Sequence, residues 1–201
     1  FTSFVDFISG SNGHIETTLG NVYSGTPNSL EVPANDSLEV KAVPDTGFHI
    51  VDVEVGKYSF DAYGVPQLVK SSVGTPETYT FENHLDTDDT YKITFAINTF
   101  EIEPVSKYKT IYDSSAETTQ ATTQTVSYQN DVSFYVNLND PTYAVYGILV
   151  DNVSYPIPAA SGSITYSNFK LTNTSNDYLE VKFTAVVANH RLEVQDYDKS
   201  P

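Results

Sequence analysis

The chain has 201 residues, of which 39% are hydrophobic and 13% aromatic, and it contains no Cys, Met or Trp. This composition is sufficient for packed cores and excludes a disordered polypeptide, while the lack of Cys excludes disulfides and thiolate metal sites. The formal net charge of −16, from 26 acidic and 10 basic residues, argues against nucleic acid and anionic membrane surfaces as partners, because both select Lys and Arg.

The first half of the chain has the pattern of short β-strands separated by turns. Each candidate strand alternates apolar and polar residues, which predicts a strand with one buried face. Gly, Pro, Asn and Asp mark the turns, as in residues 9–13 and 44–47. Residues 57–76, where Gly and Pro recur, are expected to be irregular. The expected strands are residues 4–8, 30–32, 38–43, 48–55, 79–81 and 91–97.

The second half repeats the pattern of the first. Four apolar residues of segment 48–55 recur in segment 143–150 at a constant offset of 95. By the same comparison, strands 79–81 and 91–95 correspond to segments 164–166 and 179–183, and residues 5–8 correspond to 100–103. A period of roughly 90 residues is too long for a solenoid unit and fits a small domain with its own core.

We therefore predict an all-β protein made of two tandem small antiparallel β-sandwich-like domains. The first domain is expected to span residues 1–97 and the second residues 98–187, with no separate linker between them. Residues 188–201 form a C-terminal strand or tail. The Thr-rich segment 113–125 is either a flexible loop or an edge strand. No segment shows the 3.6-residue period and capping residues of an amphipathic helix.

Three segments of the first copy, residues 9–15, 44–55 and 79–99, carry a resemblance to a known family. Together they resemble the divergent internalin-type B-repeat family of bacterial surface proteins. The second copy is a looser match, since it lacks the early Gly-rich turn and has Pro141-Thr142 in place of Thr46-Gly47. The resemblance implies secretion, an all-β module and a structural or adhesive role on a cell surface, and it transfers no catalytic residues.

The C-terminal segment looks like a strand whose partner is missing. Residues 192–195 repeat the apolar–acidic–apolar–polar pattern of residues 100–103, the expected opening strand of the second copy. A lone strand exposes unpaired backbone groups, and a neighbouring subunit could accept it by strand addition. Repeated head to tail, such a contact makes a homo-oligomeric filament. The residues that would enter the neighbouring sheet are Leu192 and Val194, with Phe4 and Phe7 as the equivalents at the other end. The alternatives are that the tail folds back onto its own domain, or that the native chain continues past residue 201.

No set of residues in the sequence predicts catalysis. The histidines lie in four different expected elements without a ligand spacing, whereas a metal or acid–base site requires several such groups to converge. There is no nucleophile elbow, no phosphate-binding Gly-rich loop and no paired-carboxylate motif. We therefore expect a non-enzymatic protein without a cofactor. The four histidines are His14, His49, His84 and His190.

The acidic turn of Asp86, Asp88 and Asp89 is the weak candidate for a metal site. Closely spaced carboxylates in a turn can supply several of the oxygens that Ca²⁺ requires. The spacing is not that of an EF-hand loop, so a solvated turn is the favoured interpretation and Ca²⁺ the alternative.

Three sequons suggest a modification. Asn35, Asn152 and Asn173 are each followed two positions later by a Ser, which is the acceptor pattern for N-glycosylation. All three are expected in turns or loops. We predict that they carry glycans if the host N-glycosylates.

The favoured function is a secreted, non-enzymatic structural protein of a cell or virion surface, a subunit of an extracellular filament or adhesive appendage. The alternative is a glycan-binding adhesion module, because exposed Tyr residues of loops 57–76 or 155–163 could stack on sugars. Most of the 15 Tyr and 11 Phe residues are nevertheless expected in the core and in cross-strand pairs. An extracellular location fits the missing initiator Met, which indicates a removed leader or a fragment. No apolar run approaches the ~18 residues of a membrane helix, so no membrane insertion is expected.

Overall fold

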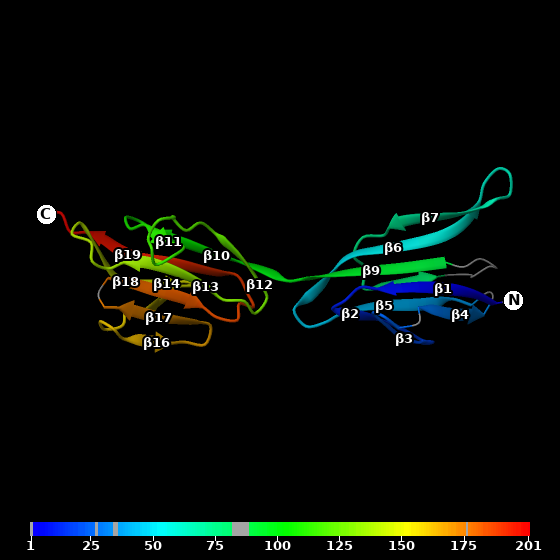
Figure 1. The fold of residues 1–201 in the computed structure, drawn as a ribbon, viewed down its shortest axis with the longest axis horizontal. Coiled ribbons are helices and arrows are strands. Elements are labelled where there is room, and N and C mark those ends of the chain that lie inside the picture. The colour runs from blue at the N-terminus through cyan, green and yellow to red at the C-terminus, as the bar shows by residue number, and fades with distance from the viewer. Residues whose placement is uncertain (1, 27, 34–35, 82–88, 176) are drawn as a thin grey trace. The chain divides into compact units, whose positions relative to one another are not determined.

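The computed structural model describes residues 2–26, 28–33, 36–81, 89–175 and 177–201. In these ranges the chain forms β-strands and no helix, and the strands belong to four sheets (Figure 1). The prediction of an all-β protein with tandem β-sandwich-like domains is confirmed. The chain divides into two compact units, Phe1–Asn98 and Thr99–Pro201, here called domain 1 and domain 2.

Domain 1 is a sandwich of a five-stranded and a four-stranded sheet. The strand orders are β4-β1-β9-β6-β7 and β3-β2-β5-β8. Apolar side chains from alternate positions of both sheets form one core, which includes Phe7, Val40, Val53, Phe81 and Tyr91. The strands are β1 (Thr2–Ser9), β2 (Gly13–Thr17), β3 (Gly20–Tyr23), β4 (Ser29–Pro33), β5 (Leu38–Pro44), β6 (Phe48–Phe60), β7 (Pro66–Ser72), β8 (Thr78–Phe81) and β9 (Asp89–Ile97).

Domain 2 is a sandwich of two five-stranded sheets. Their strand orders are β12-β10-β19-β14-β15 and β11-β13-β18-β17-β16. Its separate core includes Ile102, Phe134, Ile148, Leu179 and Leu192. The strands are β10 (Thr99–Ser106), β11 (Ile111–Tyr112), β12 (Gln124–Ser127), β13 (Val132–Asn137), β14 (Tyr143–Val150), β15 (Val153–Tyr155), β16 (Ser163–Thr165), β17 (Phe169–Thr174), β18 (Tyr178–Phe183) and β19 (His190–Asp198).

One sheet of each domain is mixed rather than purely antiparallel. The first strand of each domain lies parallel to the last, β1 beside β9 and β10 beside β19. The other pairs are antiparallel, and β6 and β14 occupy the same place next to β9 and β19. The two domains thus share a topology in which the first and last strands are neighbours in the middle of a sheet.

This topology corrects the correspondence expected for the closing strands. The strand of Tyr91 corresponds to β19, not to segment 179–183, because β9 and β19 both pair with the first strand of their domain. Segment 179–183 forms β18, which pairs with β13 as β8 pairs with β5. The sequence comparison placed them wrongly because β18 and β19 alternate apolar and polar residues in the same way. Domain 2 has β16 and β17 beside β18, whereas domain 1 has β3 beside β2, a strand without a counterpart among the described strands of domain 2.

The structure places both terminal strands inside their own domains, so the premise that they lack a partner strand does not hold in the single chain. Leu192 and Val194 are buried in β19, which pairs with β10 on one side and β14 on the other. The segment 188–201 is therefore not a separate tail, because most of it is a central strand of domain 2. At the other end, β1 lies between β4 and β9 with Phe7 fully buried and Phe4 on the more exposed side. Both strands satisfy their backbone hydrogen bonds within their own domain.

The structure defines the conformation of two further segments, residues 57–72 and residues 113–125. Residues 57–72 are not an irregular excursion, because β6 continues to Phe60 and pairs with β7 as a long hairpin (Figure 1). Gly64 lies in the turn with a φ of 76°, and Pro66 is the first residue of β7. Most of segment 113–125 is a loop, with one bridge between Tyr112 and Gln120 before β12 begins at Gln124.

Candidate functional site

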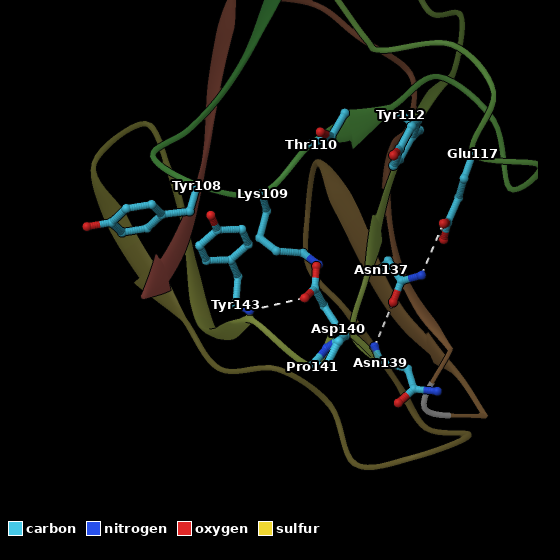
Figure 2. Close-up of a pocket in the computed structure, with 10 residues that line it drawn as sticks. All are labelled: Tyr108, Lys109, Thr110, Tyr112, Glu117, Asn137, Asn139, Asp140, Pro141 and Tyr143. Atoms are coloured by element: carbon cyan, nitrogen blue, oxygen red, sulfur yellow. Dashed lines mark hydrogen bonds and ion pairs between the residues drawn. The ribbon is translucent and has the colours of Figure 1, made fainter. Parts of the chain in front are cut away.

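A polar cleft of about 310 Å³ opens at one end of domain 2 (Figure 2). It lies between the segment that joins β10 to β11 and the turn that joins β13 to β14. The sequence favours irregular backbone in the turn between β13 and β14, because this turn contains Asn, Asp and Pro in succession. The lining residues are Tyr108, Lys109, Thr110, Tyr112, Glu117, Asn137, Asn139, Asp140, Pro141 and Tyr143.

One wall of the cleft is fixed from beneath by Asp196 of β19. Its carboxylate accepts hydrogen bonds from the backbone N–H groups of Lys107, Tyr108 and Lys109 at 3.3, 2.9 and 2.6 Å. A carboxylate that accepts several backbone N–H groups holds a loop in one conformation. The last strand of domain 2 thereby positions the loop that follows its first strand.

The floor of the cleft contains a buried ion pair. Lys109 Nζ lies 2.7 Å from Asp140 Oδ2, and the lysine side chain is almost fully enclosed. Asp140 Oδ1 also accepts hydrogen bonds from the backbone N–H groups of Thr142 and Tyr143. The hydrogen bond from Lys109, followed by these two backbone bonds, lowers the pKa of Asp140 to about 2. Asp140 is therefore charged at neutral pH, and its contact with Lys109 holds the two loops together.

Two tyrosines form an aromatic wall beside this ion pair. The rings of Tyr108 and Tyr143 are stacked, with centroids 5.4 Å apart and planes 9° from parallel. Figure 2 shows the two rings side by side at the mouth of the cleft. Tyr108 is partly exposed, and Lys107 Nζ lies 4.8 Å from the centroid of its ring.

The opposite wall is a chain of polar side chains. Asn137 Nδ2 donates to Glu117 Oε2 at 3.1 Å, and Asn137 Oδ1 accepts from the backbone N–H of Asn139 at 2.7 Å (Figure 2). Amide groups can donate to a hydroxyl or accept from one, and a carboxylate can accept from one. A cleft with an aromatic face on one side and such groups on the other fits a polar, hydroxyl-rich ligand.

The described part of the chain contains no group of three or more His, Cys, Asp or Glu residues that could hold a metal ion. Asp86 and Asp88, two residues of the expected acidic turn, lie outside the described residues. Asp89 is the first residue of β9 and is half-buried. The Ca²⁺ alternative thus rests on the sequence pattern alone.

The three described histidines lie in three different strands. His14 Nε2 is 3.0 Å from Glu16 Oε1, and His190 Nδ1 is 2.7 Å from Asp151 Oδ2. His49 Nδ1 is hydrogen-bonded to Asn98 Oδ1 at 2.8 Å. Each thus has a local polar partner, and His84 lies outside the described residues.

The structure separates the sequons into different environments. Asn152 is exposed in the two-residue turn between β14 and β15, where it and Asp151 both have positive φ angles. Asn173 is not in a loop as expected: it lies in β17, is only 5% exposed, and its Nδ2 donates to the carbonyl of Pro158 at 2.9 Å. Burial removes Asn173 from the accessible acceptors. Asn35 lies outside the described residues.

Sequence reasoning did not select the residues of the cleft. The turn over residues 139–142 was expected, but its contact with the loop around Tyr108 depends on pairing between strands far apart in sequence. One signal was present: Lys107-Tyr108-Lys109 places two of the ten basic residues of an acidic chain around a tyrosine.

Comparison with known proteins gives no match to a family model, a curated protein or a solved structure. No helix in the described ranges has the length and apolar character that a membrane span requires.

Proposed function

We propose that this chain is a non-enzymatic structural subunit of an extracellular assembly on a cell or virion surface. The arrangement of two similar domains in succession supports this role: β9 ends at Ile97 and β10 begins at Thr99, so the domains follow each other directly along the chain. Repeated small β domains joined in this way are suited to act as spacers, because each has its own core.

The observation that carries the proposal is the exposed apolar surface of the β6–β7 hairpin. Tyr63 at its turn is 92% exposed and Phe60 is 65% exposed, and Tyr58 and Val65 are exposed as well. The turn itself is ordered by Asp61, whose Oδ1 accepts from the backbone N–H groups of Tyr63 and Val65. Large apolar side chains gathered on one ordered projection mark a contact surface.

The charge of the hairpin suggests a second copy as the partner. Between residues 57 and 72 the only charged residues are Lys57, Asp61 and Lys70, in a chain with a formal net charge of −16. This projection is thus slightly basic, and it fits an acidic face elsewhere on another copy. A contact between two different faces is heterologous, and it can extend head to tail.

The test is the association state of the full chain at increasing concentration. Light scattering and electron microscopy should show oligomers or filaments, and Phe60→Ser combined with Tyr63→Ser should shift the material toward monomer. Tyr146→Ser is the matched control, because Tyr146 of domain 2 is similarly exposed but not on the hairpin. A chain that stays monomeric at the highest concentration reached refutes the proposal.

A second candidate function, glycan binding, is favoured by the domain 2 cleft. The partly exposed ring of Tyr108 offers a stacking surface, and Asn137, Asn139 and Glu117 offer hydrogen-bonding groups. A glycan array probed with the full chain should then give selective binding that Tyr108→Ala abolishes. Tyr197→Ala, at a tyrosine that is also partly exposed but does not line the cleft, should leave it intact. Equal loss with both variants, or no binding, excludes the cleft as a glycan site.

A further inference from the structure

The two domains differ at the strands β8 and β18. In domain 2, β18 has a neighbour on each side, β13 and β17. In domain 1, the corresponding strand β8 pairs with β5 alone within the described ranges, and the smaller sheet ends there. The position that β17 fills in domain 2 therefore has no occupant among the described strands of domain 1.

The correspondence between β8 and β18 is exact in register. Val40 lies opposite Tyr79 and Leu38 opposite Phe81 in domain 1. Phe134 lies opposite Val181 and Val132 opposite Phe183 in domain 2. In each domain these pairs belong to the core cluster or pack against it. The strands β8 and β18 thus have equivalent neighbours, β5 and β13, and each turns its apolar face toward the core of its own domain.

In domain 2, β17 closes the side of the sandwich. Its residues Phe169 and Leu171 are buried. The Phe169 ring lies 4.9 Å from that of Tyr155 in β15, and 5.8 Å from that of Phe183. Tyr155 lies opposite Ile148. One strand with apolar residues at alternate positions therefore covers the inner faces of β14 and β15.

In domain 1 the same place is an open apolar groove of about 420 Å³. Val73 lies opposite Val53, as Tyr155 lies opposite Ile148, because Val73 N–H donates to the carbonyl of Val53. Val73 is partly exposed, and Val69 further along is 57% exposed. The groove is lined by Val55, Lys57, Ser59, Val69, Ser71, Val73 and Tyr79.

The edge of β8 away from β5 presents backbone N–H and C=O groups that can form hydrogen bonds with an added strand. Ala42 N–H donates to the carbonyl of Glu77 at 2.7 Å, so Glu77 directs its backbone groups toward β5. Backbone groups alternate in direction along an antiparallel strand. The N–H and C=O groups of Thr78 and Thr80 therefore point away from β5, on the open side of β8, whose residue Tyr79 lines the groove.

We propose that the groove of domain 1 accepts an extended segment of another polypeptide, which adds antiparallel to β8 in the position that β17 occupies in domain 2. Main-chain hydrogen bonds to Thr78 and Thr80 supply affinity, and apolar side chains at alternate positions of the segment enter the groove. This proposal deepens the assembly role proposed above, since it names a contact by which the subunit is joined to a partner.

The groove has room for one strand and not for a second sandwich. Lys57 Nζ lies 5.9 Å from the centroid of the Tyr79 ring, so β8 faces β6, and β7 extends the larger sheet one strand further. Neighbouring strands are about 4.8 Å apart. Because β7 extends beyond β8 by one strand, it covers one strand added to β8 and blocks the approach of a whole second domain. A second copy offers no spare strand in its described ranges, because every strand there already belongs to a sheet. The occupant is thus a segment of a different polypeptide.

The groove also defines the chemistry of that segment. It needs an aromatic or large aliphatic residue to cover Val73, as Phe169 covers Tyr155, and a second apolar residue two positions away that continues along the groove toward Val69. Among the described residues, Lys57 is the one charged residue that lines the groove, and it favours an acidic residue opposite it.

The experiment uses the full chain labelled with ¹⁵N and a synthetic peptide with the sequence of residues 167–175, which contains β17. With peptide at millimolar concentration, the amide signals of Thr78 and Thr80 should shift in a saturable way, and their hydrogen exchange should slow. A peptide with Lys in place of both Phe169 and Leu171 is the control probe. Absence of a shift at this concentration, or shifts confined to other residues, overturns the proposal.

Two pairs of variants locate the site. Thr80→Pro removes an N–H that points away from β5, so no hydrogen bond to β5 is lost. An edge strand tolerates Pro at such a position. The variant should weaken peptide binding by about tenfold or more. Thr80→Ala keeps that N–H and should bind normally. Val69→Lys on the inner face of the hairpin should weaken binding, whereas Phe60→Lys on its outer face should not. Equal binding by all four variants refutes the assignment.

The result is separable from the test of the assembly role. If the chain associates through Phe60 and Tyr63 without using the groove, the Phe60 and Tyr63 variants change the association state while the peptide fails to bind. Conversely, peptide binding in a chain that stays monomeric supports the groove and refutes self-association through the hairpin.

Discussion

Val51 and Tyr146 occupy the same position in the two domains, each as the extra residue of a β-bulge. The pairing of β6 with β9 shifts between Ile50 and Asp52, and that of β14 with β19 shifts between Val145 and Gly147. Both extra residues are exposed. A bulge re-aims the residues that follow it, so the shared bulge places Val53 and Ile148 in equivalent core positions.

Those two residues test whether the cores are independent. Val53 and Ile148 are fully buried in different clusters, and Val53→Ala and Ile148→Ala should each lower the free energy of unfolding by about 2 to 4 kcal/mol, as cavity-forming changes do. Calorimetry should show each effect in a different transition. Val51→Ala, at an exposed bulge residue, should change stability little. A single transition affected equally by both core variants would contradict independent cores.

The local β-structure could be predicted because it depends on alternation, and the order of strands in the sheets could not. The offset of 95 correctly matched β6 with β14, where bulge and register agree. The comparison of alternating patterns failed at the closing strands, because Leu179 and Leu192 start equally good alternating segments. Only long-range pairing with β10 shows that the second is the counterpart of Tyr91.

The candidate sites were less predictable than the strands, for the same reason. Asp140 was placed correctly in a turn, but its ion pair with Lys109 joins residues on two separate loops. The groove beside β8 is even less visible in sequence, since it results from a difference in strand number between two sheets. Nothing in the residues 78–81 themselves distinguishes an edge strand from an internal one.

The Asp140–Lys109 pair predicts an acid dependence of domain 2. The pKa of Asp140 is about 2 in the folded chain, against an ordinary value of 3.8. The pair therefore stabilises the fold fully above pH 3.8, and this contribution is lost as pH falls toward 2. Asp140→Asn should lower the free energy of unfolding most at neutral pH, and its difference from the parent chain should shrink between pH 4 and 2. Urea unfolding at several pH values measures this.

Lys109→Met provides the complementary variant for the same pair. It removes the largest cause of the lowered pKa, so Asp140 should titrate closer to its ordinary value. The acid loss of stability should still begin near pH 3.8, but it should be smaller and should be complete at a higher pH than in the parent chain. A difference between Asp140→Asn and the parent chain that stays constant from pH 7 to 2 would contradict the ion-pair account.

Tyr91 predicts a change at the opposite end of the pH scale. Its hydroxyl is buried in the core of domain 1 without a hydrogen-bond partner among the described residues, and burial raises its pKa to about 12 from 10.0. The fold keeps this contribution below pH 10 and loses it as pH rises through 12. Tyr91→Phe should exceed the parent stability by about 1 kcal/mol at pH 7, and it should lose less stability between pH 10 and 12. Tyr63→Phe, at the exposed hairpin turn, should leave stability as in the parent chain at pH 7 and between pH 10 and 12. A clear destabilisation by Tyr91→Phe would mean that the hydroxyl has a partner.

Glycosylation should distinguish the two described sequons. In a host that N-glycosylates, Asn152 should carry a glycan because its turn is exposed, whereas Asn173 should not because its amide is buried and bonded to Pro158. Peptide mass mapping reads each site separately. Ser154→Ala should remove the glycan at Asn152 without changing that residue, and Ser175→Ala should leave the glycan pattern unchanged. A glycan found at Asn173 would contradict the buried position.

Deletion of residues 189–201 should unfold domain 2 rather than block assembly. The deletion removes all of β19, which lies between β10 and β14 and contributes Leu192 and Val194 to the core. Loss of a central strand leaves two half-sheets with unpaired edges. The unfolding transition of domain 2 should therefore disappear, while that of domain 1 remains. Deletion of residues 1–8 should have the mirror effect, because β1 lies between β4 and β9 in domain 1. Circular dichroism and calorimetry of both deletions measure this, and a truncated chain that keeps both transitions would show that the strand is dispensable to its own domain.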